Sequence, residues 1–152
     1  MSAVFPLPAA MARALELARA AGQAGEVPIG AVVTSGGLIV GEGENRNRRD
    51  SDPTAHAEMV AIRAAAAHLG DYRLAGCDLY VTLEPCAMCA GAISHARIAR
   101  LYYGAEDAKG GGVAHGARVF AQAQCHHRPE VYGGIGEGEA AALLTGFFVG
   151  KR

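Results

Sequence analysis

The sequence has no long apolar run and no strong excess of charge of either sign. No stretch approaches the roughly 18 uninterrupted apolar residues that a membrane-spanning helix needs. The N-terminus also lacks a basic segment followed by a long apolar run. We therefore expect a cytoplasmic protein with no membrane contact. The formal net charge of −1 argues mildly against a non-specific nucleic-acid binder, which is normally strongly basic.

Internal repeats, low-complexity linkers and the composition of a disordered chain are absent as well. With 152 residues, of which 51% are hydrophobic and 19% charged, we expect one soluble domain that spans 1–152 and has a real core. Four cysteines are present, but a P-C-x-x-C motif without a signal peptide favours a metal over disulfides. Cys77 is then expected to be buried, and Cys125 to be an exposed thiol or an accessory ligand.

The stretch Thr82 to Ser94 carries the first metal-binding motif. Cys86 and Cys89 follow Pro85, which suits the first turn of a helix. The spacing of i and i+3 places both thiols on one helix face, and the helix dipole favours their ionised form. Since the thiolate is the form that binds zinc, this segment predicts two metal ligands.

A nitrogen ligand is available at a second expected helix start. There Asp52 is the predicted N-cap, Pro53 the first helical residue, and His56 the ligand. One histidine and two cysteines leave the fourth position of a zinc ion open, as in catalytic zinc sites. The alternative is a structural zinc whose fourth ligand is Cys125 or His127.

Glu58 lies two residues beyond the histidine ligand. From there it can reach a metal-bound water without binding the metal, which is the place for a proton shuttle. The alternative is a first-turn glutamate that only complements the helix dipole, worth roughly 0.3–1 kcal/mol. Because the predicted metal ligands accompany Glu58, the proton-shuttle role is favoured.

The remaining pattern predicts strands alternating with helices after an initial hairpin. Because Pro129 precedes the last strand, that strand is expected at the sheet edge. A glycine-rich loop is expected over 107–116. The fold class is therefore α/β, a three-layer α/β/α sandwich around a five-stranded sheet. Helices are predicted at about 8–24, 53–69, 85–95 and 138–149, and strands at 29–34, 38–41, 77–83, 100–103 and 130–132.

The H-x-E motif that begins at His56 and the P-C-x-x-C motif that begins at Pro85 together resemble the signature of zinc nucleobase deaminases. Within that superfamily the chain is similar to the bacterial tRNA-specific adenosine deaminases. The resemblance implies a cytidine-deaminase type of fold with a mixed sheet, one zinc ion per subunit, a homodimer and a tRNA anticodon stem-loop as partner. The similar segments are 27–32, 41–43, 45–46, 52–58, 80–92, 104–109 and 140–148.

The activity implied by the resemblance is hydrolytic deamination of adenosine to inosine at the wobble position of the anticodon. A zinc-activated water would attack, and Glu58 would shuttle the proton. Asn45, by itself a turn residue, matches the family asparagine that hydrogen-bonds the purine edge. Phe147 is expected in the core. Further substrate-binding positions implied by the family are Val27, Pro28, Ile29, Ala57, Leu83, Glu84, Asp107, Lys109, Arg46 and Phe148.

Two other functions stay open. Guanine deaminases and other free-base or nucleoside deaminases share both motifs. The residues at 27–30 and 82–85, however, resemble those of the tRNA-specific deaminases. A catalytically silent RNA-binding subunit typically lacks the shuttle glutamate, and here Glu58 is present. The chain departs from the family at Glu44 and in the loop that contains Gly110 and His115. These departures touch expected RNA contacts and leave the zinc motifs intact, so deaminase chemistry is better supported than the tRNA substrate.

Overall fold

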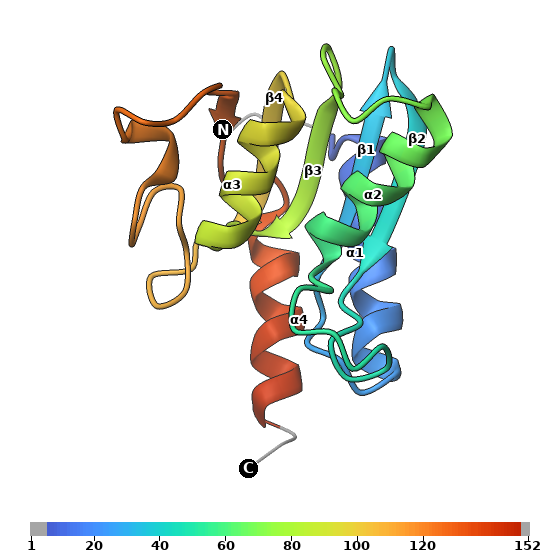
Figure 1. The fold of residues 1–152 in the computed structure, drawn as a ribbon. Helices are drawn as coiled ribbons and strands as arrows, with labels where there is room; N and C mark the ends of the chain where they lie inside the picture. Colours follow the sequence, from blue (N-terminus) through green and yellow to red (C-terminus); the bar gives the residue numbers. More distant parts are fainter. Residues whose placement is uncertain (1–5, 150–152) are drawn as a thin grey trace.

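The central sheet has the strand order β2-β1-β3-β4-β5 (Figure 1). The computed structural model describes residues 6–149. Strand β1 pairs antiparallel with β2 and β3, whereas β3, β4 and β5 run parallel, so the sheet is mixed. Strand β5 lies at the edge, as the preceding proline predicts. The strands are β1 (Gly30–Ser35), β2 (Leu38–Glu44), β3 (Asp78–Leu83), β4 (Arg100–Ala105) and β5 (Glu130–Tyr132).

Helices cover both faces of the sheet. Helices α1 and α4 share one buried cluster with the sheet, and α2 and α3 share another on the opposite face. Figure 1 shows α2 and α3 in front of the strands and α4 extending past the lower end of the sheet. The predicted three-layer α/β/α sandwich is confirmed. The helices are α1 (Ala9–Gln23), α2 (Ala57–Leu69), α3 (Ala87–Ala96), α4 (Glu137–Val149) and the short 3-10 helix η1 (Val119–Ala121), which the sequence pattern misses.

Within residues 6–149, every helix is too short or too polar to cross a membrane.

The two cysteines outside the metal motif, Cys77 and Cys125, lie in different environments. Cys77 is buried in the core beside α2 and α3, as predicted. The Cys125 thiol lies 3.4 Å from Ser94 Oγ and donates to the carbonyl of His127 at 3.2 Å.

Helix α2 lies unusually close to β2 because two glycines face it. A Cβ atom at Gly43 would lie 2.4 Å from the carbonyl oxygen of Ala57, and one at Gly41 would lie 2.4 Å from that of Ala61. Neither position has space for a side chain. This close approach presses the first turn of α2 onto the sheet, where Glu58 becomes buried.

The predicted start of α2 is wrong by one turn. The helix begins at Ala57 rather than Pro53. Asp52 does not cap it, because its Oδ1 accepts hydrogen bonds from the backbone N–H and the hydroxyl of Thr54, both at 2.8 Å. The segment from Pro53 to the helix is therefore a turn, in which the short side chain of Asp52 competes with helix formation.

Helix α3 likewise begins at Ala87, just beyond the predicted Pro85. The residues at the two N-cap positions are thus His56 and Cys86, with extended ψ angles of 153° and 175°. Neither side chain caps its own helix. Because they are not used as caps, both side chains are available to a ligand between the two helix starts.

Candidate active site

Three ligand atoms from the two helix starts converge next to the carboxyl end of β3. His56 Nδ1 lies 3.6 Å from Cys86 Sγ and 3.5 Å from Cys89 Sγ. With Zn–N near 2.0–2.1 Å and Zn–S near 2.3 Å, tetrahedral zinc keeps nitrogen and sulfur ligands about 3.5 Å apart. The spacing of His56, Cys86 and Cys89 therefore fits a zinc ion bound through Nδ1 and both sulfurs.

The group contains only these three ligands among the histidine, cysteine, aspartate and glutamate side chains of residues 6–149. His127, one alternative fourth ligand, places its Nε2 2.7 Å from the carbonyl oxygen of Ile98. Cys125, the other, contacts Ser94 and His127 as described above. The arrangement thus leaves a fourth position for water, as in catalytic zinc sites.

Hydrogen bonding between the two thiols shifts their pKa values in opposite directions. Hydrogen bonds to Cys89 and His56 lower the pKa of the Cys86 thiol to about 4. The hydrogen bond to Cys86 and burial raise the pKa of Cys89, which keeps its proton while Cys86 is ionised. The site therefore stabilises a thiolate before a metal binds, and metal binding releases the remaining proton.

Glu58 lies at the second position of α2 and faces the same space as the metal ligands. Its side chain is buried with 4% exposed, and it lines a cavity together with His56 and Cys86. Burial raises the pKa of Glu58 to about 7, and the negative charge of Cys86 adds to the effect. A carboxyl group with a pKa near neutrality can both accept and return a proton.

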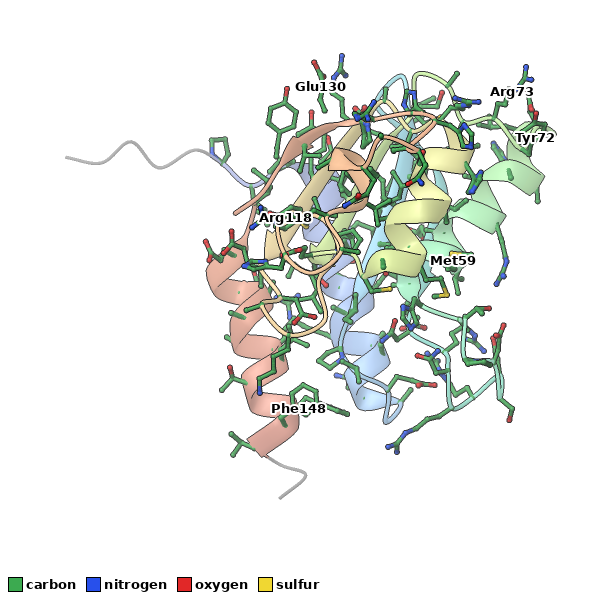
Figure 2. All side chains as sticks on the ribbon, turned by 60° about the vertical axis from the view of Figure 1, so that its left-hand side comes forward. Met59, Tyr72, Arg73, Arg118, Glu130 and Phe148 are labelled. Carbon is green, nitrogen blue, oxygen red and sulfur yellow. The ribbon has the colours of Figure 1, made fainter. Side chains whose placement is uncertain are left out.

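The cavity has a volume of about 950 Å³ and is open to solvent. It is formed by the ends of β2, β3 and β4, the segment before β1, the starts of α2 and α3, and the end of α4. Phe148 lies near the end of α4 (Figure 2). Of the residues predicted to bind substrate, Val27, Ile29, Asn45, Leu83, Glu84, Asp107, Lys109 and Phe148 line the cavity. Asn47, Glu106, Gly110 and Leu144 line it as well and were not predicted.

Asn45 is held in a fixed orientation at the cavity wall. It is 5% exposed, and its Oδ1 accepts a hydrogen bond from the backbone N–H of Ala57 at 2.9 Å. The end of β2 and the start of α2 are thereby joined through one amide group. The Ala57 N–H is consequently used by Asn45, and Ala57 does not line the cavity.

Two further predicted substrate-binding residues lie outside the cavity lining. Pro28 is buried, although its neighbours in sequence, Val27 and Ile29, line the cavity. Arg46 forms an ion pair with Asp50 at 3.0 Å on the surface. Sequence similarity places both residues in the right segment, but the direction of each side chain depends on its local backbone.

Glu26 is a structurally important residue that sequence reasoning misses. It is 2% exposed and accepts hydrogen bonds from the backbone N–H groups of Arg48 at 3.1 Å and Arg49 at 2.9 Å. Its carboxylate also contacts Nε of Arg49 at 3.3 Å. Glu26 therefore holds the loop after β2, which contributes Asn47 to the cavity. A single loop glutamate has no spacing pattern that would have revealed this role.

A second cavity of about 380 Å³ shares Val27, Asn47 and Phe148 with the first. Phe147 was expected in the core but is only half-buried and lines this second cavity. Since only Ala140 of α4 is fully buried, the helix lies at the surface and offers its aromatic residues to the cavities rather than to the core.

An α/β/α sandwich with a His-Cys-Cys metal group and a buried glutamate defines a zinc-dependent deaminase. Residues 7–105 match the cytidine and deoxycytidylate deaminase zinc-binding region, and the chain belongs to this family. It is 56% identical over 142 residues to a tRNA-specific adenosine deaminase of Agrobacterium fabrum, covering 93% of each chain.

Solved structures agree with this assignment. One from studies of A-to-I editing by tRNA:A34 deaminases at the wobble position of transfer RNA has a TM-score of 0.88 and 56% identity, covering 89% of this chain and 98% of the other. A guanine deaminase from Nitrosomonas europaea has a TM-score of 0.81 and 26% identity, covering 97% and 87%. The fold is thus shared with deaminases of both free bases and tRNA.

Proposed function

We propose that the protein deaminates adenosine to inosine at the wobble position of a tRNA anticodon. The observation that carries this proposal is the open cavity above the His-Cys-Cys group, whose rim bears Lys109 and the half-exposed Phe148. A flipped-out base fits such an opening while its neighbours stay at the rim. The 56% identity to the tRNA-specific relative supports the same substrate.

His56, Cys86 and Cys89 would hold the zinc ion, which supplies an activated water as nucleophile when it is bound. Glu58 accepts the proton of the attacking water and delivers it to a ring nitrogen of adenine. The water oxygen forms a bond to C6, the second water proton passes by way of Glu58 to the amino group, and the C6–N bond breaks as ammonia departs. Asn45 hydrogen-bonds the purine edge and fixes the orientation of the ring.

Residues at the rim would hold the neighbouring nucleotides. The Phe148 side chain, 52% exposed, offers a face on which a base can stack, worth about 1–3 kcal/mol per base. Lys109 is exposed and suits a phosphate contact. Arg46 has to exchange Asp50 for a phosphate before it contributes.

We further propose a homodimer with one zinc ion per subunit, acting in the cytoplasm. The outer face of α3 would form the dimer interface with a second copy of the chain. It exposes small and apolar residues, among them Met88 with 37% of its area exposed. Met59 lies nearby at the start of α2 (Figure 2). Met88→Glu should convert the dimer to a monomer in light scattering after size exclusion, and a wild-type monomer would contradict the proposal.

The substrate is tested by incubating the zinc-loaded protein with an anticodon stem-loop RNA that carries adenosine at the wobble position, and separately with guanine. We expect inosine in the RNA and no xanthine. Guanine turnover without RNA turnover would replace the proposed substrate by a free base, as in the guanine deaminase that shares this fold. The absence of both activities in a zinc-loaded protein would favour the silent RNA-binding subunit.

A further inference from the structure

The carboxylate of Glu84 is enclosed by the loop that follows β4. Its side chain has 0% of its area exposed although it borders the cavity. Oε1 accepts from the backbone N–H of Asp107 at 3.2 Å and lies 2.8 Å from His115 Nδ1. Oε2 accepts from the backbone N–H groups of Val113 at 3.2 Å, Ala114 at 3.0 Å and His115 at 3.1 Å.

These contacts use the full acceptor capacity of the side chain. An ionised carboxylate offers about four lone-pair sites, and five donors surround Glu84. A buried charge needs such donors, since desolvation without them is costly. No acceptor site is left for a ribose hydroxyl or a base, so Glu84 is bound to the protein's own loop.

The same loop is also fixed sterically to the turn that carries Cys86. A Cβ atom at Gly111 would lie 2.3 Å from Glu84 Oε2, and one at Gly112 would lie 2.5 Å from the backbone nitrogen of Ala87. The N–H of Gly112 donates to the carbonyl of Pro85 at 2.8 Å. Glycine is therefore required at both positions for the loop to approach the metal-bearing turn.

We propose that Glu84 and His115 are positioning residues that hold segment 107–110 as a wall of the substrate cavity. This inference rests on the proposed tRNA function and assigns to Glu84 an indirect role in place of the direct substrate contact that the family resemblance implies. Glu84 joins both ends of the loop, at Asp107 and at residues 113–115. Between these ends lie Lys109 and Gly110, which line the cavity.

The loop is prepared for binding before RNA arrives. Asp107 Oδ1 accepts from the N–H groups of Lys109 at 3.2 Å and Gly110 at 2.9 Å, which closes a local turn. Glu84 anchors that turn, and His115 supplies the one side-chain donor to Glu84 among the hydrogen bonds of residues 6–149. Ordering a loop in advance lowers the cost of binding. Loss of the His115 contact should thus weaken substrate binding more than the chemical step.

The decisive variants are His115→Ala and His115→Asn. Asparagine places its amide nitrogen near the position of Nδ1 and keeps a donor for Glu84, whereas alanine removes it. For His115→Ala we expect KM for the anticodon stem-loop to rise about tenfold with kcat within about twofold, as for the loss of one charge-assisted hydrogen bond. His115→Asn should stay near the wild type, as should the control His68→Ala at the exposed end of α2. Zinc content should be full in all three.

Limited proteolysis tests the loop without any activity. Lys109 is the sole trypsin site between Arg100 and Arg118. Cleavage after Lys109 should be about tenfold faster in His115→Ala, because local opening becomes easier, and unchanged in the other two variants. If the wild type does not act on the stem-loop, the proposed function fails. The cleavage rate still tests whether His115 and Glu84 hold the loop in place. Equal cleavage rates in His115→Ala and the wild type, or a fall in kcat at constant KM, would overturn the inference.

Discussion

His56 and Cys86 occupy the same position in their helices, and this explains how two short motifs make one site. Each is an N-cap residue with an extended backbone and no capping hydrogen bond from its side chain. Glu58, two residues beyond His56, and Cys89, three residues beyond Cys86, then face the same space from the first turn of each helix. The ligand types and their spacing predict this convergence, although the sequence pattern places the start of α2 one turn too early, at Pro53.

Replacement of Glu58 by glutamine should separate metal binding from catalysis. The variant keeps the size of the side chain but cannot take up a proton, so turnover on the anticodon stem-loop should fall by a factor of 10² or more. Zinc content should stay unchanged. The free energy of unfolding should stay unchanged or rise slightly, since a buried charge is removed. Normal turnover would mean that Glu58 only complements the helix dipole.

Glu26 should make stability depend on pH. Burial would raise the pKa of Glu26, but hydrogen bonds from Arg49 and Arg48 more than offset it and hold the pKa below its usual value. Its stabilising contribution is therefore present above the unfolded-state pKa of about 4.3 and is lost as pH falls through the lower folded-state value. Glu26→Gln should cost about 1–3 kcal/mol at pH 7 and progressively less at acidic pH.

Urea unfolding at a series of pH values measures this difference. Glu16→Gln is the matched control, because Glu16 is exposed on α1 and pairs only at the surface with Arg13. Its effect should stay within about 0.5 kcal/mol at every pH. A Glu26→Gln penalty that does not shrink in acid would show that the carboxylate charge is not what holds the loop after β2.

At the scale of elements, the sequence predicts which helices and strands exist better than where they begin. Asp52 and Pro53 satisfy the pattern of a helix start, yet the hydrogen bonds from Thr54 to Asp52 form a turn instead. Local patterns cannot separate these outcomes, because the choice depends on how closely α2 approaches β2. That approach is set by Gly43 and Gly41 on the neighbouring strand.

Gly43→Ala should therefore disturb the metal site from a distance. The added Cβ would lie 2.4 Å from the carbonyl oxygen of Ala57, so the first turn of α2 must move. We expect a loss of about 1–3 kcal/mol in unfolding free energy, as for overpacking, together with weaker zinc retention against a chelator. Gly138→Ala in α4 has open space and should be neutral or slightly stabilising. Equal behaviour of the two variants would contradict the close-packing argument.

At the scale of the whole molecule, the cavity lies where the carboxyl ends of β3 and β4 meet the starts of two helices. The alternation of strands and helices predicts three layers, and Pro129 predicts the edge position of β5. They do not predict the order β2-β1-β3-β4-β5, because strand pairing depends on contacts distant in sequence. The sequence likewise predicts only part of the cavity wall contributed by α4, namely Phe148 but not Leu144. The assignment of residues 1–152 to one domain stays a prediction.

Charge at the cavity rim should control RNA affinity. Lys109→Ala should weaken binding to the anticodon stem-loop and flatten its dependence on salt concentration by about one unit of log slope, as for one lost phosphate contact. Arg73→Ala is the control, since Arg73 lies at the opposite end of the molecule from Phe148 (Figure 2). Fluorescence anisotropy over a salt series measures both. An unchanged slope for Lys109→Ala would remove that residue from the RNA-binding surface.

The turn between β1 and β2 has a practical consequence for attaching other molecules to the protein. Gly36 and Gly37 adopt positive φ angles there, and the adjacent Leu38 has 72% of its area exposed. This turn lies at the end of the sheet away from the cavity, which is bordered by the start of β1 and the end of β2. A dye, surface tether or inserted peptide at the turn would thus leave the substrate entrance free. A fusion joined directly behind Phe148 would begin at that entrance and compete with RNA for space.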